Sequence, residues 1–216
     1  MSADFTRTQR AVLQGMSQDQ PLSAVSAVLH ELRAGTHTRH VALEKRLPFF
    51  SDTLDLERYT RLLSAYYGFY HELENRLLHS PWHVDGFDLQ QRLKTPALGK
   101  DLQALGVSVQ PLALCETLPA IHSQAAMLGV LYVLEGATLG GNILRKQMSE
   151  RLGLEAHNGC AFLYVYGEAT GRQWKAFMDF LGSVPLDAQA RGETIQAARS
   201  TFSCFEHWLE RQEVLL

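Results

Sequence analysis

The chain has 216 residues, of which 46 % are hydrophobic and 20 % are charged, and its 20 basic and 23 acidic side chains give a net charge of −3. This length and apolar content suffice for one domain with its own core. A nucleic-acid-binding protein is not expected, because neutralising phosphates requires a surplus of Lys and Arg.

The cysteines indicate a reducing compartment. Cys115, Cys160 and Cys204 are odd in number and form no Cys-x-x-Cys pair, so neither a disulfide framework nor a zinc site is expected. No basic N-terminal start precedes a long apolar run, as it would in a signal peptide. No apolar stretch reaches the ~18 residues that cross a membrane. We therefore expect a cytoplasmic protein without a membrane partner.

The first part of the chain is expected to hold a tail and two helices. Residues 1–22 are polar and rich in Gln, which predicts a flexible tail, and residues 23–216 are expected to form one helical domain. The first helix of this domain is predicted to end near Pro48. The second, capped by Ser51 or Asp55, has apolar residues at the i, i+3, i+4, i+7 spacing of a helix.

The middle of the chain continues this pattern. Thr95 is expected to cap a short helix that carries Pro96 in its first turn and ends at Gly106. Residues 121–152 form one long apolar and periodic segment, and Gly153 fits the cap at its C-terminal end.

Two further helices are predicted, one beginning at Thr170 or Gly171 and one with an apolar stripe from residue 195 to residue 209. Residues 162–166 (FLYVY) could form a short strand. One such run cannot build a sheet, so the sequence predicts an all-α, single-domain helical bundle.

Most motifs of metal and cofactor sites are absent from the sequence. No Glu lies three residues before a His, which argues against a di-iron bundle, and the HExxH, GxGxxG and GxSxG patterns are missing. One candidate metal-binding pair remains, because His40 and Glu44 are four residues apart and share a helix face. A neutral imidazole can bind a metal through one nitrogen while a carboxylate orients the other. The alternative, which the sequence alone favours, is an ordinary solvated His–Glu pair.

Three glycines lie inside the long apolar segment: Gly136, Gly140 and Gly141. Each costs a helix about 1 kcal/mol relative to alanine, which is large against a net domain stability of ~5–15 kcal/mol. Gly136 and Gly140 clear one helix face, where a flat ligand could lie against the backbone, and they permit a bend. Close packing between helices explains the same glycines equally well.

Two segments resemble haem oxygenases. Residues 32–44 (LRAGTHTRHVALE) are similar to the proximal helix of that family, and residues 131–141 (LYVLEGATLGG) are similar to its distal helix in bacterial members. The resemblance continues through residues 170–175 and the last helix, in the same order. It is strongest to the biliverdin-forming enzymes that accompany bacteriophytochromes.

The resemblance implies an all-α fold with haem held between the two helices. It also implies a reaction in which haem, O2 and electrons from an external donor, a reductase or a ferredoxin-type protein, give biliverdin, carbon monoxide and free iron. A bacteriophytochrome is then a possible acceptor of biliverdin. His40 matches the axial iron ligand and Glu44 its hydrogen-bond partner. Gly136 and Gly140, with Gly141 beside them, match the glycines that let the distal helix bend over haem.

The resemblance further places three side chains at the haem propionates and one at the haem edge; these are Arg33, Tyr132 and Lys175, and then Phe202. Two positions depart from the mammalian pattern. Ala137 stands in place of an Asp that orders distal water, and Asp179 stands in place of an Arg that steers the propionates. Because Thr138 is expected to face away, water held by helix carbonyls near Gly136 is the expected proton source.

Two other functions are compatible with the sequence. A haem carrier or sensor would share the fold without turnover. An all-α hydrolase or a structural bundle would not bind haem at all.

Overall fold

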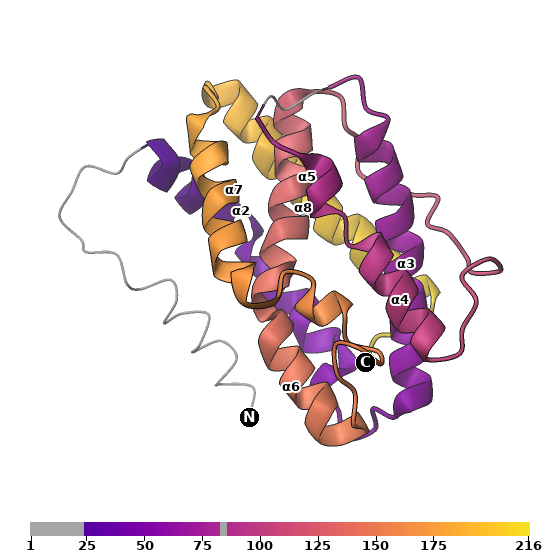
Figure 1. Ribbon diagram of the computed structural model, residues 1–216. Helices are drawn as coiled ribbons and strands as arrows, with labels where there is room; N and C mark the ends of the chain where they lie inside the picture. The colour runs from indigo at the N-terminus through magenta and orange to yellow at the C-terminus, as the bar shows by residue number, and fades with distance from the viewer. Residues whose placement is uncertain (1–23, 83–85) are drawn as a thin grey trace.

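The computed structural model describes residues 24–82 and 86–216, so the predicted tail lies outside the described residues. Every regular element in this described part is helical, which confirms the all-α prediction (Figure 1). The α-helices are α2 (Ala24–Arg46), α3 (Leu56–Leu78), α4 (Thr95–Ala104), α5 (Gln124–Gly136), α6 (Gly141–Leu152), α7 (Thr170–Ser183) and α8 (Ala188–Arg211). Short 3₁₀ turns join them: η1 (Pro48–Phe50), η2 (Leu89–Arg92), η3 (Ala137–Gly140), η4 (Phe162–Tyr164) and η5 (Gly167–Ala169).

Most helix ends follow the sequence signals. Asp55 caps α3 and accepts a hydrogen bond from the Arg58 amide at 2.8 Å. Gly153, with φ of +68°, ends α6 in the left-handed conformation that glycine adopts without strain. The start of α4 differs from the prediction, because Thr95 is the first helical residue rather than the cap.

A carboxylate from another helix replaces the predicted cap of α4. Glu74 of α3 accepts the backbone N–H of Lys94 at 2.6 Å and that of Thr95 at 3.0 Å. Those amides are the donors that a capping side chain would have satisfied. The tertiary contact between α3 and α4 therefore makes the local cap unnecessary.

The bundle is built around α5 and α8. Helix α8 packs against α5, α2 and α3, while α7 covers α2 and α4 lies on α3 (Figure 1). Two glycines allow the close approach of neighbouring helices. A Cβ added at Gly129 of α5 would lie 2.1 Å from the Thr194 carbonyl of α8, and one added at Gly35 of α2 would lie 2.5 Å from Ile195 Cγ2.

Two sequence predictions change in the structure. The segment 121–152 is broken into α5, η3 and α6, with the 3₁₀ turn at the predicted bend. The short strand predicted at 162–166 is wrong, because η4 forms there. Asp101 of α4 accepts the backbone N–H groups of Ala161 and Phe162 at 2.6 and 2.8 Å, which holds this stretch in a tight turn.

Three further observations bear on the sequence expectations. The run Gln124–Leu152 is long and apolar enough, by length and composition, to cross a membrane, but half of its most apolar window is buried inside the bundle. The core helix of a bundle passes the same test. Cys115, Cys160 and Cys204 are free cysteines in the structure. Within residues 24–82 and 86–216, no group of three or more His, Cys, Asp or Glu is arranged to hold a metal.

Candidate functional site

His40 and Glu44 form a contact on α2 that is accessible from outside the core. The imidazole Nε2 lies 3.3 Å from Glu44 Oε1, and 35 % and 27 % of the two side chains are exposed. The other ring nitrogen, Nδ1, makes no hydrogen bond to any residue that the structure describes. One nitrogen is thus oriented by a carboxyl group while the other remains available to a ligand, the arrangement that a metal-binding histidine requires.

The surroundings favour the neutral forms of both side chains. Burial lowers the pKa of His40, and the nearby His37 lowers it further, so the imidazole keeps a free lone pair. Burial raises the pKa of Glu44 to about 7. The contact is therefore no permanent salt bridge. For Nδ1 to bind a metal, Nε2 must carry the proton and donate it to Glu44.

We expect Glu44→Gln to change how the stability of the ligand-free protein depends on pH. Burial raises the pKa of Glu44 from 4.5 to about 7, so its contribution to stability is complete below the unfolded pKa and is lost as pH rises through 7. Gln does not titrate. Between about pH 5 and about pH 8, the free energy of unfolding should therefore fall on the order of 1–3 kcal/mol more in the wild type than in the variant.

Urea denaturation at both pH values measures this difference. Parallel pH profiles for the two proteins would contradict the burial of an ionisable carboxyl at position 44.

Phe202 of α8 packs against the ring of His40. The ring centroids lie 5.7 Å apart in an edge-on arrangement, with an interplanar angle of 64°. The predicted iron ligand and the predicted aromatic at the haem edge, which are 162 positions apart in the sequence, thus meet in space. The contact limits the orientations that the imidazole can adopt.

Tyr132 of α5 connects the two helices that the sequence proposes for haem. Its hydroxyl hydrogen-bonds to the side chain of Thr36 on α2, and Arg33 lies close enough to lower its pKa electrostatically, although burial raises that pKa overall. The Thr36 hydroxyl also donates to the Leu32 carbonyl at 2.7 Å. Tyr132 and Arg33 therefore lie together, as the propionate prediction requires.

The contact between Tyr132 and Thr36 also relates the glycines of the distal segment to His40. Helices α2 and α5 both run from the upper to the lower part of the view in Figure 1. One helical turn beyond Thr36 comes His40, and one turn beyond Tyr132 comes Gly136. The contact between Tyr132 and Thr36 thus lies one turn before the bend on α5 and one turn before His40 on α2.

The three glycines have right-handed backbone angles, so none of them is required by a positive φ. They differ instead in the room that is available for a Cβ atom. A Cβ added at Gly141 would lie 2.1 Å from the Leu163 carbonyl, which assigns this glycine to close packing against η4. A Cβ added at Gly136 would lie 3.7 Å from the Trp174 ring, an ordinary contact. Gly140 is buried.

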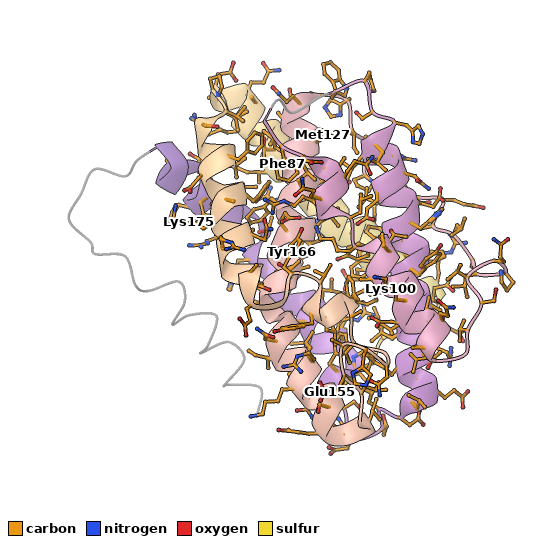
Figure 2. All side chains as sticks on the ribbon, in the orientation of Figure 1. Phe87, Lys100, Met127, Glu155, Tyr166 and Lys175 are labelled. Carbon is orange, nitrogen blue, oxygen red and sulfur yellow. The ribbon has the colours of Figure 1, made fainter. Side chains whose placement is uncertain are left out.

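Lys175 is less integrated than the other predicted residues. It lies on α7, pairs with Asp179 one turn later, and has 74 % of its side chain exposed. Figure 2 shows it on the outer side of α7, away from Tyr166 in the middle of the bundle. The neighbouring Trp174 faces inward, 5.9 Å from the Tyr132 ring.

Sequence reasoning missed one charged cluster beside the bend. Glu135, with only 1 % of its side chain exposed, is contacted by Arg92, Lys94 and Tyr166. A charged residue inside an otherwise apolar helix was the available signal. Its partners come from two loops, so the sequence pattern could not identify them.

Known proteins resemble this chain over most of its length. The haem oxygenase family matches residues 26–211. A haem oxygenase of Xanthomonas campestris pv. campestris is 32 % identical over 154 residues, which are 70 % of this chain and 88 % of that protein. Haem oxygenase PigA of Pseudomonas aeruginosa is 27 % identical over 176 residues, 82 % of this chain and 88 % of PigA.

A solved structure of a haem oxygenase also matches this chain. The haem oxygenase of Neisseria meningitidis, determined with NO and CO bound, is 25 % identical and has a TM-score of 0.70, and the match covers 89 % of this chain and 92 % of that one. This chain therefore belongs to the haem oxygenase family, as the two sequence motifs predicted.

Proposed function

We propose that the protein binds haem between α2 and the bend that joins α5 to α6, and cleaves it to biliverdin, carbon monoxide and iron. One observation carries the proposal within the family. His40, whose imidazole contacts the Glu44 carboxyl group, lies one helical turn beyond Thr36, and Thr36 contacts Tyr132, which lies one turn before the glycine-containing bend.

The residues present fit haem. Imidazole is a common axial ligand of haem iron, and a flat macrocycle needs a nearby surface without bulky side chains. Gly136 has no side chain, and the flat Trp174 ring lies beside it, 3.7 Å from where a Cβ would stand. Phe202 beside His40 supplies an apolar edge.

Bound haem supplies the iron at which O2 reacts and the porphyrin carbon that is oxidised. The protein's own residues then have three tasks. His40 holds the iron through a neutral nitrogen, and Glu44 fixes the ring by accepting the proton on the other nitrogen. Arg33 and Tyr132 offer a cation and a phenol O–H to the propionates, which charge-assisted hydrogen bonds favour.

Neither side chain that follows Gly136 can deliver a proton to the distal side. Ala137 has no donor, and the Thr138 hydroxyl is engaged, because it donates to the Glu135 carbonyl at 2.8 Å. That bond also occupies one of the carbonyls expected to hold water at the bend. We therefore assign the proton supply to water at the remaining polar groups of the site.

The reaction needs electrons that no described residue provides. We propose an external donor, a reductase or a ferredoxin-type protein, in the cytoplasm. A bacteriophytochrome that takes up biliverdin is the proposed recipient of the product, because the sequence as a whole resembles the enzymes that accompany bacteriophytochromes.

Arg33→Ala should weaken haem binding more than Lys175→Ala does. Arg33 is partly buried beside Tyr132, where a charge is poorly screened, and burial lowers its pKa. Lys175 is exposed and already paired with Asp179, and exposed pairs contribute only about 0–1 kcal/mol. We expect about tenfold weaker binding for Arg33→Ala, the effect of losing one hydrogen bond to a charged group, and less than about threefold for Lys175→Ala.

Titration with haemin, followed by absorbance, gives both affinities. An equal loss in both variants would place Lys175 at the propionates alongside Arg33. No loss in either would remove both from the site.

A haem carrier or sensor is the second candidate function, because Ala137 lacks the distal acid of mammalian members. The same titration excludes the third possibility, a bundle without haem, when a Soret band develops at one equivalent of haemin. A protein that gives no Soret band would overturn the proposed function.

A further inference from the structure

Glu135 is the most deeply buried carboxylate beside the proposed site. It is the last residue before Gly136, and its two oxygens meet donors from two separate loops. Arg92 Nη1 lies 2.7 Å from Oε2, the Tyr166 hydroxyl donates to Oε1 at 2.8 Å, and the Lys94 ammonium also binds Oε1. Burial raises the pKa of Tyr166, so the phenol remains a donor.

The charges in this cluster balance. Arg92 and Lys94 face Glu135, and the carboxylate of Glu74 holds the backbone N–H of Lys94. The Lys94 side chain is 2 % exposed. Buried ion pairs of this kind add little net stability compared with apolar residues, since desolvation offsets the attraction. The main effect of such ion pairs is to hold the surrounding residues in one geometry.

The geometry that the cluster fixes is the end of α5. Thr138 donates its hydroxyl to the Glu135 carbonyl, so both the side chain and the main chain of this residue are held where η3 begins. Arg92 also donates to the Gln173 carbonyl of α7 at 3.1 Å. The next residue of α7, Trp174, is the side chain that a Cβ at Gly136 would contact.

We propose that Glu135 is a positioning residue for the haem site. Its carboxylate, bound by Arg92, Lys94 and Tyr166, fixes the point at which α5 turns into η3. The cluster thereby sets where Gly136 lies, and with it how closely the backbone of the bend would approach haem bound there and a ligand such as CO on it. The identity of the ligand rests on the proposed function, but the placement of the bend does not.

Hydrogen exchange in the ligand-free protein tests the placement of the bend. Tyr166→Phe removes a single hydrogen bond to Glu135 and keeps the ring. Amides of residues 137–141 should then exchange about tenfold faster, the effect of losing one hydrogen bond to a charged group. The matched control is Tyr59→Phe, which removes another buried phenol bond, to the Gly159 carbonyl at 2.8 Å, and should leave these amides unchanged.

A second variant separates positioning from stability. Lys94→Met combined with Glu135→Gln removes both charges of the most deeply buried pair. Arg92, whose side chain is 11 % exposed, keeps the amide oxygen introduced at position 135 and the Gln173 carbonyl as acceptors, so the protein should fold. The stretching frequency of CO bound to ferrous haem reports the distal surroundings without turnover. We expect a shifted or split band in the double variant and in Tyr166→Phe, and the wild-type band in Tyr59→Phe.

Wild-type exchange at residues 137–141 in Tyr166→Phe, or a folded double variant with the wild-type CO band, would show that the cluster only stabilises the bundle and would overturn the proposal. The exchange experiment contains no haem, so a protein that fails to bind or cleave haem would refute the proposed function while leaving this test valid.

Discussion

His40→Ala should abolish the spectrum of histidine-ligated haem. The imidazole is the proposed iron ligand, which contacts Glu44 and packs against Phe202, and alanine supplies no donor atom in its place. Loss of an outer hydrogen-bond partner alone costs metal sites about 10–100-fold in affinity, so loss of the ligand itself should cost at least about tenfold. Apolar contacts to the porphyrin should retain some haem, in a form without a protein ligand on the proximal side.

Two controls make this prediction specific. Added imidazole should restore the spectrum of His40→Ala, because it can occupy the space that the side chain leaves. His37→Ala should change the spectrum little, since His37 is exposed and acts on His40 only through its charge. Loss of the spectrum in His37→Ala together with its retention in His40→Ala would reverse the assignment.

Gly141→Ala should destabilise the protein more than Gly136→Ala, although each substitution adds one methyl group. Its Cβ would lie 2.1 Å from the Leu163 carbonyl, and backbone cannot move aside as a flexible side chain can. Overpacking costs about 1–3 kcal/mol, and the better helix propensity of alanine returns about 1 kcal/mol at most. Thermal unfolding should therefore occur several degrees lower, at about 2–4 °C per kcal/mol for a chain of this size.

Gly136→Ala is the matched comparison, because it adds the same methyl group one turn earlier. There the Cβ would lie 3.7 Å from Trp174, so the ligand-free protein should keep or slightly raise its stability. If Gly136 lies against haem, binding or turnover should nonetheless fall. Thermal unfolding with and without haem separates the two effects. A Gly136→Ala variant with unchanged haem binding and turnover would assign this glycine to helix packing.

The helices and several of their ends could be predicted from the sequence because their causes are local. Apolar periodicity located α3, Asp55 provided its cap, and Gly153 provided the end of α6. The spacing of Gly136 and Gly140 permits a bend, which the resemblance to haem oxygenases also implies, and η3 forms there. Each of these signals lies within a few residues of the feature it determines.

The features that escaped prediction depend on contacts between distant segments. Thr95 does not cap α4, because Glu74 of α3 satisfies the first amides of that helix. The stretch 162–166 is not a strand, because Asp101 of α4 binds its amides. The apolar, β-prone composition of that stretch gave no sign of this partner.

The candidate site also combines features that local spacing predicts with features that depend on contacts between distant segments. The pairing of His40 with Glu44 follows from their spacing on one helix. The sequence could not distinguish Gly136 from Gly141, since the difference is the distance of each to Trp174 or to the Leu163 carbonyl. Nor could it connect Glu135 with Tyr166, which lies 31 positions away and contacts it only in the folded bundle.

Conversion of haem to biliverdin by the purified protein decides whether this member of the family is an oxygenase. The one-to-one complex with haemin should be supplied with electrons in air by a ferredoxin and its reductase, and the pigment should be extracted and separated by chromatography. We predict that the Soret band decays while biliverdin absorption appears and carbon monoxide is released. A protein that binds haem through His40 and yet forms no biliverdin with any electron donor would contradict this function and would be a haem carrier or sensor.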